Sequence, residues 1–151
     1  MKVTLRSVYA EPCGVDALYD LLRERSEEDD PHTNISHRTL PPYKAHAKFV
    51  RSIPYQAWYF VKVDGLIAGS VNVTKNNEIG IVLSADYRGK GIGQVALKLL
   101  LARRCPGPAI PTHRAGRFLA NVNPENKRSI RLFTSLGFKL IQHTYALGEE
   151  A

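Results

Sequence analysis

A glycine-rich loop between an apolar run and a helix-like run constrains this chain more than any other feature. Residues 86–93 read DYRGKGIG; they follow EIGIVLSA and precede QVALKLLLARR. A helix that begins at such a loop presents backbone N–H groups without intrahelical partners at the positive end of its dipole. Glycines let the backbone approach an anion closely, and Arg88 and Lys90 add positive charge. The pattern therefore predicts an anion site where a strand passes into a helix.

The positive charge of the chain is concentrated in the half that starts at this loop. The formal net charge is +7; residues 1–86 carry 10 Lys/Arg and 11 Asp/Glu, whereas residues 87–151 carry 11 and 3. This asymmetry indicates a polyanionic partner, either a nucleic acid or a multiply phosphorylated cofactor. No basic strand interleaved with aromatic residues supports nucleic-acid recognition, so no nucleic-acid partner is expected.

Hydrophobic periodicity predicts a mixed α/β (α+β) domain on one central sheet. Asp64-Gly65 marks a tight hairpin, Pro124 suits the first turn of the last helix, and Gly137 suits its end. No linker or repeat divides residues 1–151, so a single domain is expected. The expected strands are 2–9, 57–63, 66–74, 78–84, 117–122 and 138–147, and the expected helices are 14–26, 42–52, 91–104 and 124–136.

Composition and length limit the cellular context that we expect. No apolar run approaches the roughly 20 residues of a membrane span, and the N-terminus has no signal-peptide core. Cys13 and Cys105 form no metal-like pair. We therefore expect a cytoplasmic protein with no membrane partner and no metal.

Three known phosphate-binding patterns can be compared with the loop. The P-loop needs Ser or Thr after Gly-Lys, but Gly91 follows Gly89-Lys90. Residues 91–96 (GIGQVA) match the dinucleotide fingerprint formally, yet they begin well after the strand and no acidic residue follows at the required distance. Residues 88–93 (RGKGIG) match the (Gln/Arg)-x-x-Gly-x-(Gly/Ala) pyrophosphate loop of the GNAT acetyltransferases without a mismatch.

A second segment strengthens this resemblance. Residues 126–138 (NKRSIRLFTSLGF) resemble the last-helix signature of the same family, and both signatures occur in order and at a suitable separation. The predicted element order is similar to that family over nearly the whole chain. The resemblance implies a GNAT fold: a central, mostly antiparallel twisted sheet of six to seven strands, splayed between strands 4 and 5 and flanked by about four helices.

The resemblance also implies acetyl-CoA as co-substrate, bound between residues 78–84 and 117–122. The reaction would be direct attack by an amine on the thioester in a ternary complex, with a backbone N–H near Val82 or Leu83 holding the developing negative charge. The residues implied to bind the cofactor are Val82, Leu83, Arg88, Gly89, Lys90, Gly91, Ile92, Gly93, Gln94, Asn121, Asn126, Ser129 and Phe133.

The catalytic groups are less well defined by the resemblance. Glu78 is the candidate general base, although its position also suits a simple carboxylate at a hairpin end. Phe133 stands where relatives often carry a tyrosine that protonates the leaving thiolate. Ser129 is then a candidate general acid, and water is another. The departure at Phe133 makes a non-catalytic, CoA-sensing module the alternative function.

The acceptor amine is expected to bind the first helices and their loop. Asn34, His37, His46 and Tyr55 are the candidate substrate-binding residues, and a helix-face role for His46 is the alternative. Residues 35–55 partly resemble GNAT enzymes that acetylate nucleotide-linked amino sugars. The acidic run EEDD would also suit a polyamine, an aminoglycoside or a peptide amine. A strand found in many relatives is expected to be missing at the C-terminal end, so a second copy of the chain is a candidate partner.

Overall fold

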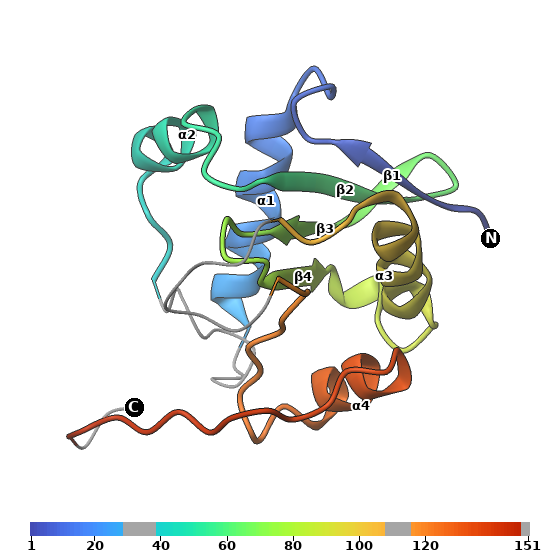
Figure 1. Cartoon of the computed structure of the whole chain (residues 1–151). Helices are drawn as coiled ribbons and strands as arrows, with labels where there is room; N and C mark the ends of the chain where they lie inside the picture. The colour runs from blue at the N-terminus through green and yellow to red at the C-terminus, as the bar shows by residue number, and fades with distance from the viewer. Residues whose placement is uncertain (29–38, 108–115, 149–151) are drawn as a thin grey trace.

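A computed structural model describes residues 1–28, 39–107 and 116–148 of the chain (Figure 1). Within these ranges no helix is long and apolar enough to cross a membrane. The elements, in chain order, are β1 (Val3–Ser7), α1 (Gly14–Glu27), α2 (Tyr43–Arg51), β2 (Ala57–Val63), β3 (Leu66–Val73), β4 (Ile79–Leu83), a 3-10 turn (Ala85–Tyr87), α3 (Ile92–Arg103) and α4 (Lys127–Ser135).

The four strands form one sheet in the order β1-β2-β3-β4, and every neighbouring pair is antiparallel. The predicted hairpin between β2 and β3 is confirmed. Asp64 and Gly65 both have positive φ, at 50° and 83°, as a two-residue turn between twisted strands requires. The turn fixes which residues of β2 and β3 lie opposite each other, and so which side chains share a face.

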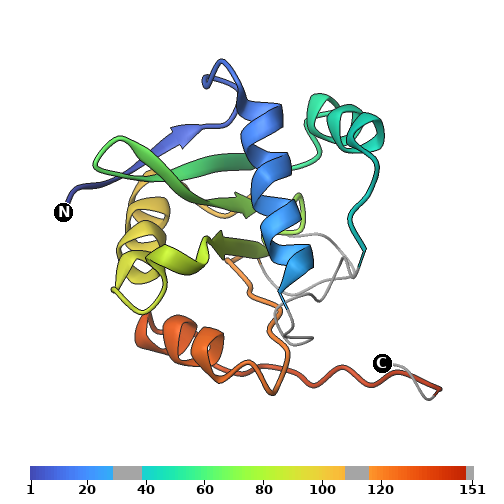
Figure 2. The same cartoon turned by 180° about the vertical axis from the view of Figure 1, so that it is seen from behind.

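Helices cover both faces of this sheet. α1 crosses one face (Figure 2), and α3 packs against the other (Figure 1). Phe60 of β2 is fully buried in one apolar cluster with Leu18 and Leu21 of α1. Its neighbour Val61 points to the opposite face and belongs to the larger cluster that contains Leu97 of α3. Alternation along β2 therefore builds both halves of the core.

The expectation of six to seven strands is wrong for the described residues, where the sheet has four. The expected strand 117–122 makes only an isolated parallel bridge at Leu119. Ile79 N–H donates to the Leu119 carbonyl (2.7 Å), and Leu119 N–H donates to the Asn77 carbonyl (2.8 Å). No further backbone bond joins this segment to β4, because the two diverge after Leu119. The expected splay between strands 4 and 5 is therefore not formed by two regular strands; beyond Leu119, a gap without backbone hydrogen bonds lies beside β4.

The last expected strand is also absent. Residues 139–148 run as an extended segment away from the body (Figure 1), and their backbone makes no hydrogen bond to any described residue. A strand needs a partner, and none of the described segments lies alongside to supply one. The large apolar side chains of this segment are exposed, namely Leu140, Ile141, Tyr145 and Leu147.

The start of α4 differs from the prediction, whereas its end agrees with it. The expected start at Pro124 is wrong, because Asn126 caps the helix: its Oδ1 accepts a hydrogen bond from Ser129 N–H (3.1 Å). An asparagine cap satisfies a first-turn donor, so the helix begins directly after it. The predicted stop is confirmed, since Gly137 follows the last turn with a φ of +92°.

Candidate active site

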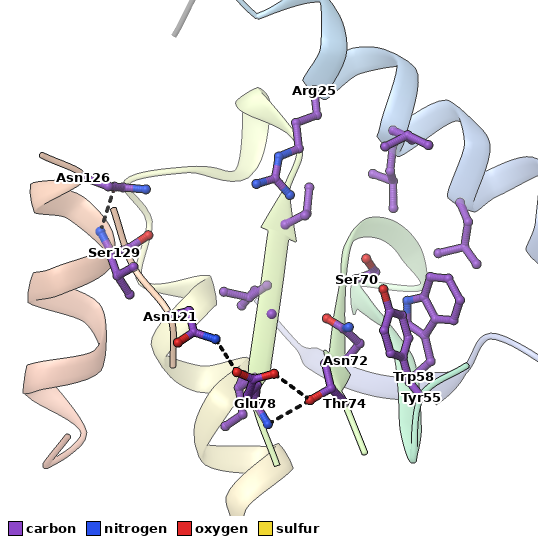
Figure 3. A pocket seen from close by; sticks show the side chains of 18 of the residues that line it. Arg25, Tyr55, Trp58, Ser70, Asn72, Thr74, Glu78, Asn121, Asn126 and Ser129 are labelled. Carbon is purple, nitrogen blue, oxygen red and sulfur yellow. Dashed lines mark hydrogen bonds between the residues drawn. The ribbon is translucent and has the colours of Figure 1, made fainter. Parts of the chain in front are cut away.

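A cavity of about 610 Å³ runs from the α1/α2 face of the sheet into the gap beside β4 (Figure 3). Its walls come from both ends of the chain, so folding brings together residues far apart in sequence. The predicted residues in its lining are His46, Tyr55, Glu78, Val82, Arg88, Asn121, Asn126, Ser129 and Phe133. Leu83 and residues 89–94 lie outside this lining, and Asn34 and His37 lie outside the described residues.

The glycine loop has the backbone geometry of an anion site. Gly89 and Gly91 have φ values of +72° and +79°, a left-handed conformation that favours glycine. α3 starts at Ile92 without a side-chain cap. From Gly89 to Gln94, no backbone N–H donates to another described residue. These consecutive donors at a helix N-terminus are available to an anion.

Two side chains of the predicted cofactor site tie this loop to neighbouring helices. Arg88 forms an ion pair with Glu28 at the end of α1, and its Nε donates to the Leu83 carbonyl (2.9 Å). Gln94 Nε2 donates to Ser135 Oγ of α4 (3.3 Å). The backbone N–H groups and the exposed Lys90 therefore remain for an anion at the loop.

The outer edge of β4 is open beyond its first residue. Ile79 N–H donates outward to the Leu119 carbonyl. N–H groups alternate in direction along a strand, so those of Ile81 and Leu83 face the gap as well. Val82 N–H faces β3, while its side chain lines the cavity. Sequence reasoning identified Leu83 but missed Ile81, which the alternation of the strand could have indicated.

Glu78 is held at the closed end of the gap (Figure 3). Its Oε2 accepts a hydrogen bond from Asn121 Nδ2 (2.5 Å), and its Oε1 accepts one from the Thr74 hydroxyl (3.3 Å). The backbone N–H of Glu78 donates back to Thr74 Oγ1 (3.1 Å). The carboxylate lines the cavity and can accept a proton there. It also joins residues 117–122 to the sheet through Asn121, and its role as general base stays a prediction.

α4 forms the opposite wall of the gap. Asn126 Nδ2 and Ser129 Oγ have no hydrogen-bond partner among the described residues, although Asn126 Oδ1 serves as the helix cap. Phe133 is buried, with its ring edge-on to Phe138 at a centroid distance of 5.2 Å. Ser129 is therefore the only hydroxyl-bearing α4 residue in the described lining of the cavity.

His46 lines the cavity but is also a structural contact between two helices. Its Nε2 donates to the Val15 carbonyl of α1 at 3.2 Å, which fixes the tautomer with a proton on Nε2. Burial lowers the pKa of His46, and the hydrogen bond to Val15 opposes this shift. Burial raises the pKa of Tyr55, which keeps its phenol protonated at neutral pH.

Several lining residues were not predicted from the sequence. Ser70 and Asn72 lie on the cavity side of β3, in line with Thr74. A signal was present, since polar residues recur at every second position of an otherwise apolar strand. Trp58 of β2 lies directly opposite Asn72. Its ring is edge-on to Tyr55 at a centroid distance of 4.7 Å.

The charged lining of the cavity is mainly positive. Arg25 of α1 points into the cavity near the far end of β4 from Glu78 (Figure 3). Burial lowers the pKa of Arg25; Glu28 acts in the opposite direction, and Arg88 lowers it further. The charged residues of the described lining are Arg25, Arg88, Arg128 and Glu78. No group of three His, Cys, Asp or Glu in the described ranges is arranged to hold a metal ion.

Comparison with known proteins gives one consistent result. Residues 15–138 match the family model described as acetyltransferase (GNAT) family. No curated protein matches the chain significantly.

Solved structures with a similar fold include three whose titles name their activity. A phosphinothricin acetyltransferase from Sinorhizobium meliloti in complex with AcCoA is 23% identical, with a TM-score of 0.71 over 94% of this chain and 77% of that one. A ribosomal L7/L12 α-N-protein acetyltransferase in complex with coenzyme A is 19% identical, with a TM-score of 0.67 over 94% and 82%. A ribosomal-protein-alanine N-acetyltransferase from Brucella melitensis is 16% identical, with a TM-score of 0.66 over 92% and 85%. At these identities the likeness establishes the fold.

Proposed function

This chain belongs to the GNAT acetyltransferase family, and from that premise we propose that it transfers the acetyl group of acetyl-CoA to a primary amine of a small molecule or a peptide. One observation carries the proposal. The row of unpartnered N–H groups from Gly89 to Gln94 lies next to the open edge of β4, and that edge leads into a cavity that contains Glu78. An elongated ligand with a pyrophosphate at one end and a reactive group at the other suits this spatial order of loop, strand edge and cavity.

Two parts of acetyl-CoA, which supplies an activated acyl thioester, have matching groups on the protein. The N–H groups of the glycine loop and the Lys90 ammonium suit the pyrophosphate. The outward N–H groups of Ile81 and Leu83 and the outward carbonyl of Ile81 suit an extended pantetheine arm, which would pair with β4 as an added strand; the Leu83 carbonyl already accepts from Arg88. From the other wall, Asn126 Nδ2 is available to the same arm.

The residues at the closed end of the gap suit direct amine attack. Glu78 would accept the proton of the attacking amine, directly or through a water molecule. The N–H of Ile81 or Leu83 would stabilise the negative charge that develops on the thioester oxygen. A thiol with a pKa of about 8.5 is an adequate leaving group near neutral pH. Ser129 or water would then protonate the thiolate in place of the tyrosine replaced by Phe133.

A CoA-sensing role without catalysis is the second candidate function. Phe133 is the observation that favours it, because a buried phenyl ring donates no proton to a leaving thiolate. Binding of acetyl-CoA without transfer to any amine in a broad panel would support this role over the enzyme.

Calorimetric titration with acetyl-CoA tests the proposal, and a separate titration with NADH serves as the comparison. Gly91→Glu places a carboxylate in the expected pyrophosphate site, and we expect it to abolish micromolar binding. Gly65→Glu is a matched control, since Gly65 and Gly91 have φ values of +83° and +79° and both have open space where a Cβ would stand. The same strain and the same added charge at position 65 should leave binding intact.

The possible results of these titrations support or contradict the proposal as follows. Loss of binding in Gly91→Glu alone supports the loop as the pyrophosphate site. Failure of the wild-type protein to bind acetyl-CoA, or equal loss in both variants, would contradict the proposal.

A further inference from the structure

We propose that Asn72 binds the acceptor beside its amine, and that the acceptor is a primary amine flanked by uncharged hydrogen-bonding groups. This inference rests on the proposed acetyl transfer and names the substrate class of that site. The evidence lies in the β3 side chains that face the cavity, in the glycine opposite Asn72, and in the charges of the lining.

Asn72 is the middle residue of three that lie side by side on the neighbouring strands β2, β3 and β4. It lies directly opposite Trp58 of β2 on one side and Gly80 of β4 on the other. A Cβ at position 80 would lie 2.4 Å from Asn72 Oδ1, so only glycine leaves the amide its present position. Glu78 projects from the same face of the chain two residues before Gly80 and lines the same cavity. Asn72 is therefore placed next to the candidate base.

The polar groups around Asn72 have no partner among the described residues. The side-chain donors and acceptors of Tyr55, Trp58, Ser70 and Asn72 make no hydrogen bond to any described residue. In the described part of the chain, no unpartnered side-chain nitrogen or oxygen is sealed from solvent. These four neutral groups therefore open onto the cavity, where a ligand can satisfy them.

The charges of the lining disfavour a polycationic acceptor. The described lining contains Arg25, Arg88 and Arg128 against a single carboxylate, that of Glu78. Glu28, from the acidic run that would attract a polyamine, pairs with Arg88, so this pair adds no net charge to the lining. A molecule with several ammonium groups would find only the Glu78 carboxylate in the described lining, and its other ammonium groups would be desolvated without a partner.

The wall beside Asn72 is both neutral and aromatic. The rings of Phe49, Tyr55 and Trp58 contact one another edge-on and form an apolar surface next to the amide. A hydroxylated or amide-bearing amine can place its C–H face on these rings and its polar groups on Asn72 and Ser70. Amino sugars and amino-acid amides share this chemistry, and the experiment distinguishes them.

Initial rates of coenzyme A release with four amines test the inference. D-glucosamine and L-alaninamide carry neutral groups, spermidine is a polycation, and L-glutamate is an acidic amine. We expect the wild-type protein to have a higher kcat/KM for one of the neutral amines than for spermidine or L-glutamate. In Asn72→Ala, the KM for that amine should rise about tenfold, while the KM for acetyl-CoA changes less than about twofold. Asn72→Leu, similar in size but without a hydrogen-bonding group, should show the same loss if the alanine variant folds poorly.

Asn76→Ala is the matched control, because Asn76 is exposed in the β3–β4 turn and does not line the cavity. It should change neither KM. Preference for spermidine or L-glutamate, or equal effects of Asn72→Ala and Asn76→Ala, would overturn the inference and leave acetyl transfer standing.

Calorimetry with acetyl-CoA distinguishes failure of the acceptor inference from failure of the proposed function. If the wild-type protein binds acetyl-CoA but acetylates none of the four amines, the acceptor inference is overturned and the cofactor site stands. If acetyl-CoA does not bind, the proposed function itself fails, and the inference fails with it.

Discussion

At the residue scale, we propose that Glu78 combines two roles, as general base and as structural carboxylate. Its carboxylate is positioned by Asn121 and Thr74, and the same contacts attach residues 117–122 to the sheet. A base is most effective when its position is fixed before the substrate arrives. Substitutions can separate this chemical role from the structural one.

Glu78→Gln should lower kcat about a hundredfold or more, because an amide cannot accept the proton of the amine. The KM for acetyl-CoA should stay close to that of the wild type. Asn121→Ala removes one positioning contact and keeps the carboxylate, so its kcat should fall much less. Steady-state rates and melting temperatures of both variants check this. Equal kcat values for Glu78→Gln and the wild type would show that Glu78 is only a structural carboxylate.

His46 should make stability depend on pH. Its unperturbed pKa is 6.5, and burial lowers the folded value. The unfolded chain therefore binds more protons as the pH falls below 6.5, so the contribution of His46 is present above that pH and is lost as the pH falls through the folded pKa. His46→Gln keeps a donor for Val15 without titrating. Melting temperatures at about pH 7.5 and about pH 5.5 should differ less in this variant than in the wild type.

His143→Gln is the control for this measurement, since His143 is exposed in the C-terminal segment. It should reproduce the wild-type pH dependence. An unchanged pH dependence in His46→Gln would contradict the assignment.

The sequence predicted the residues of contiguous motifs better than those that meet through the sheet. Asn126, Ser129 and Phe133 belong to one helix signature, so a short pattern placed them together, and the cavity does contain them. Asn72 and Trp58 meet only through the register of β2 and β3. That register depends on a bulge after Val61, which no local pattern indicates. The role of each of these residues stays a prediction.

At the scale of elements, we expect the start of α4 to serve two purposes. Asn126 caps the helix through Oδ1, and its Nδ2, which has no partner among the described residues, is the group that we propose for the cofactor. Asn126→Ala should lower the free energy of unfolding by about 1 kcal/mol, whereas aspartate caps equally well. Asn126→Asp should therefore keep the stability but weaken acetyl-CoA binding, because it lacks the amide donor. Chemical denaturation and calorimetry of both variants check this, and full binding by Asn126→Asp would exclude the amide contact.

The contact between β3 and β4 at Gly80 predicts that substitutions of Gly80 and Asn72 have non-additive effects on stability. Gly80→Ala alone should destabilise the protein by about 1–3 kcal/mol, because its Cβ meets the Asn72 amide. The three atoms nearest to that Cβ outside its chain neighbours all belong to Asn72. Adding Asn72→Ala should therefore remove most of the penalty, a non-additivity that a double-mutant cycle in urea measures. Additive effects would show that Gly80 is needed for another reason.

The elements that the sequence predicted well are those with strong local signals. The hairpin at Asp64-Gly65 and the stop at Gly137 depend on backbone conformations that few residues adopt. The strands expected over 117–122 and 138–147 have suitable composition, but strand formation depends on a neighbour. The first finds one only at Leu119, and the second finds none among the described residues.

At the scale of the whole molecule, part of the basic half lies along the proposed cofactor path. The positive charge from residue 87 onward includes Lys90 at the loop and Arg128 at the cavity. Acetyl-CoA is multiply charged, so its affinity should fall as the ionic strength rises, because salt screens attraction at exposed sites. Calorimetry at about 0.05 M and about 0.5 M salt checks this. The neutral acceptor should show little such dependence in its KM, and a salt-independent acetyl-CoA affinity would contradict the charge argument.

The single-domain organisation of residues 1–151, the cytoplasmic location and the partnership with a second copy of the chain stay predictions at this scale. The exposed apolar side chains of residues 139–148 agree with a partner that covers them. Light scattering at high concentration tests this partnership, and a monomeric mass would contradict it.

The single bridge at Leu119 has a consequence for the lifetime of the protein in a cell. Beyond β4, residues 117–122 pair with the sheet through their backbone only at Leu119, so this side of the gap has few backbone hydrogen bonds. A ligand that fills the gap adds the missing pairing and stabilises the folded form by about 2.7 kcal/mol when it is present at a hundred times its dissociation constant. Proteases cleave locally opened chains in proportion to how often they open. The abundance of this protein would then follow the acetyl-CoA supply, so that starvation for the metabolite shortens the survival of its consumer.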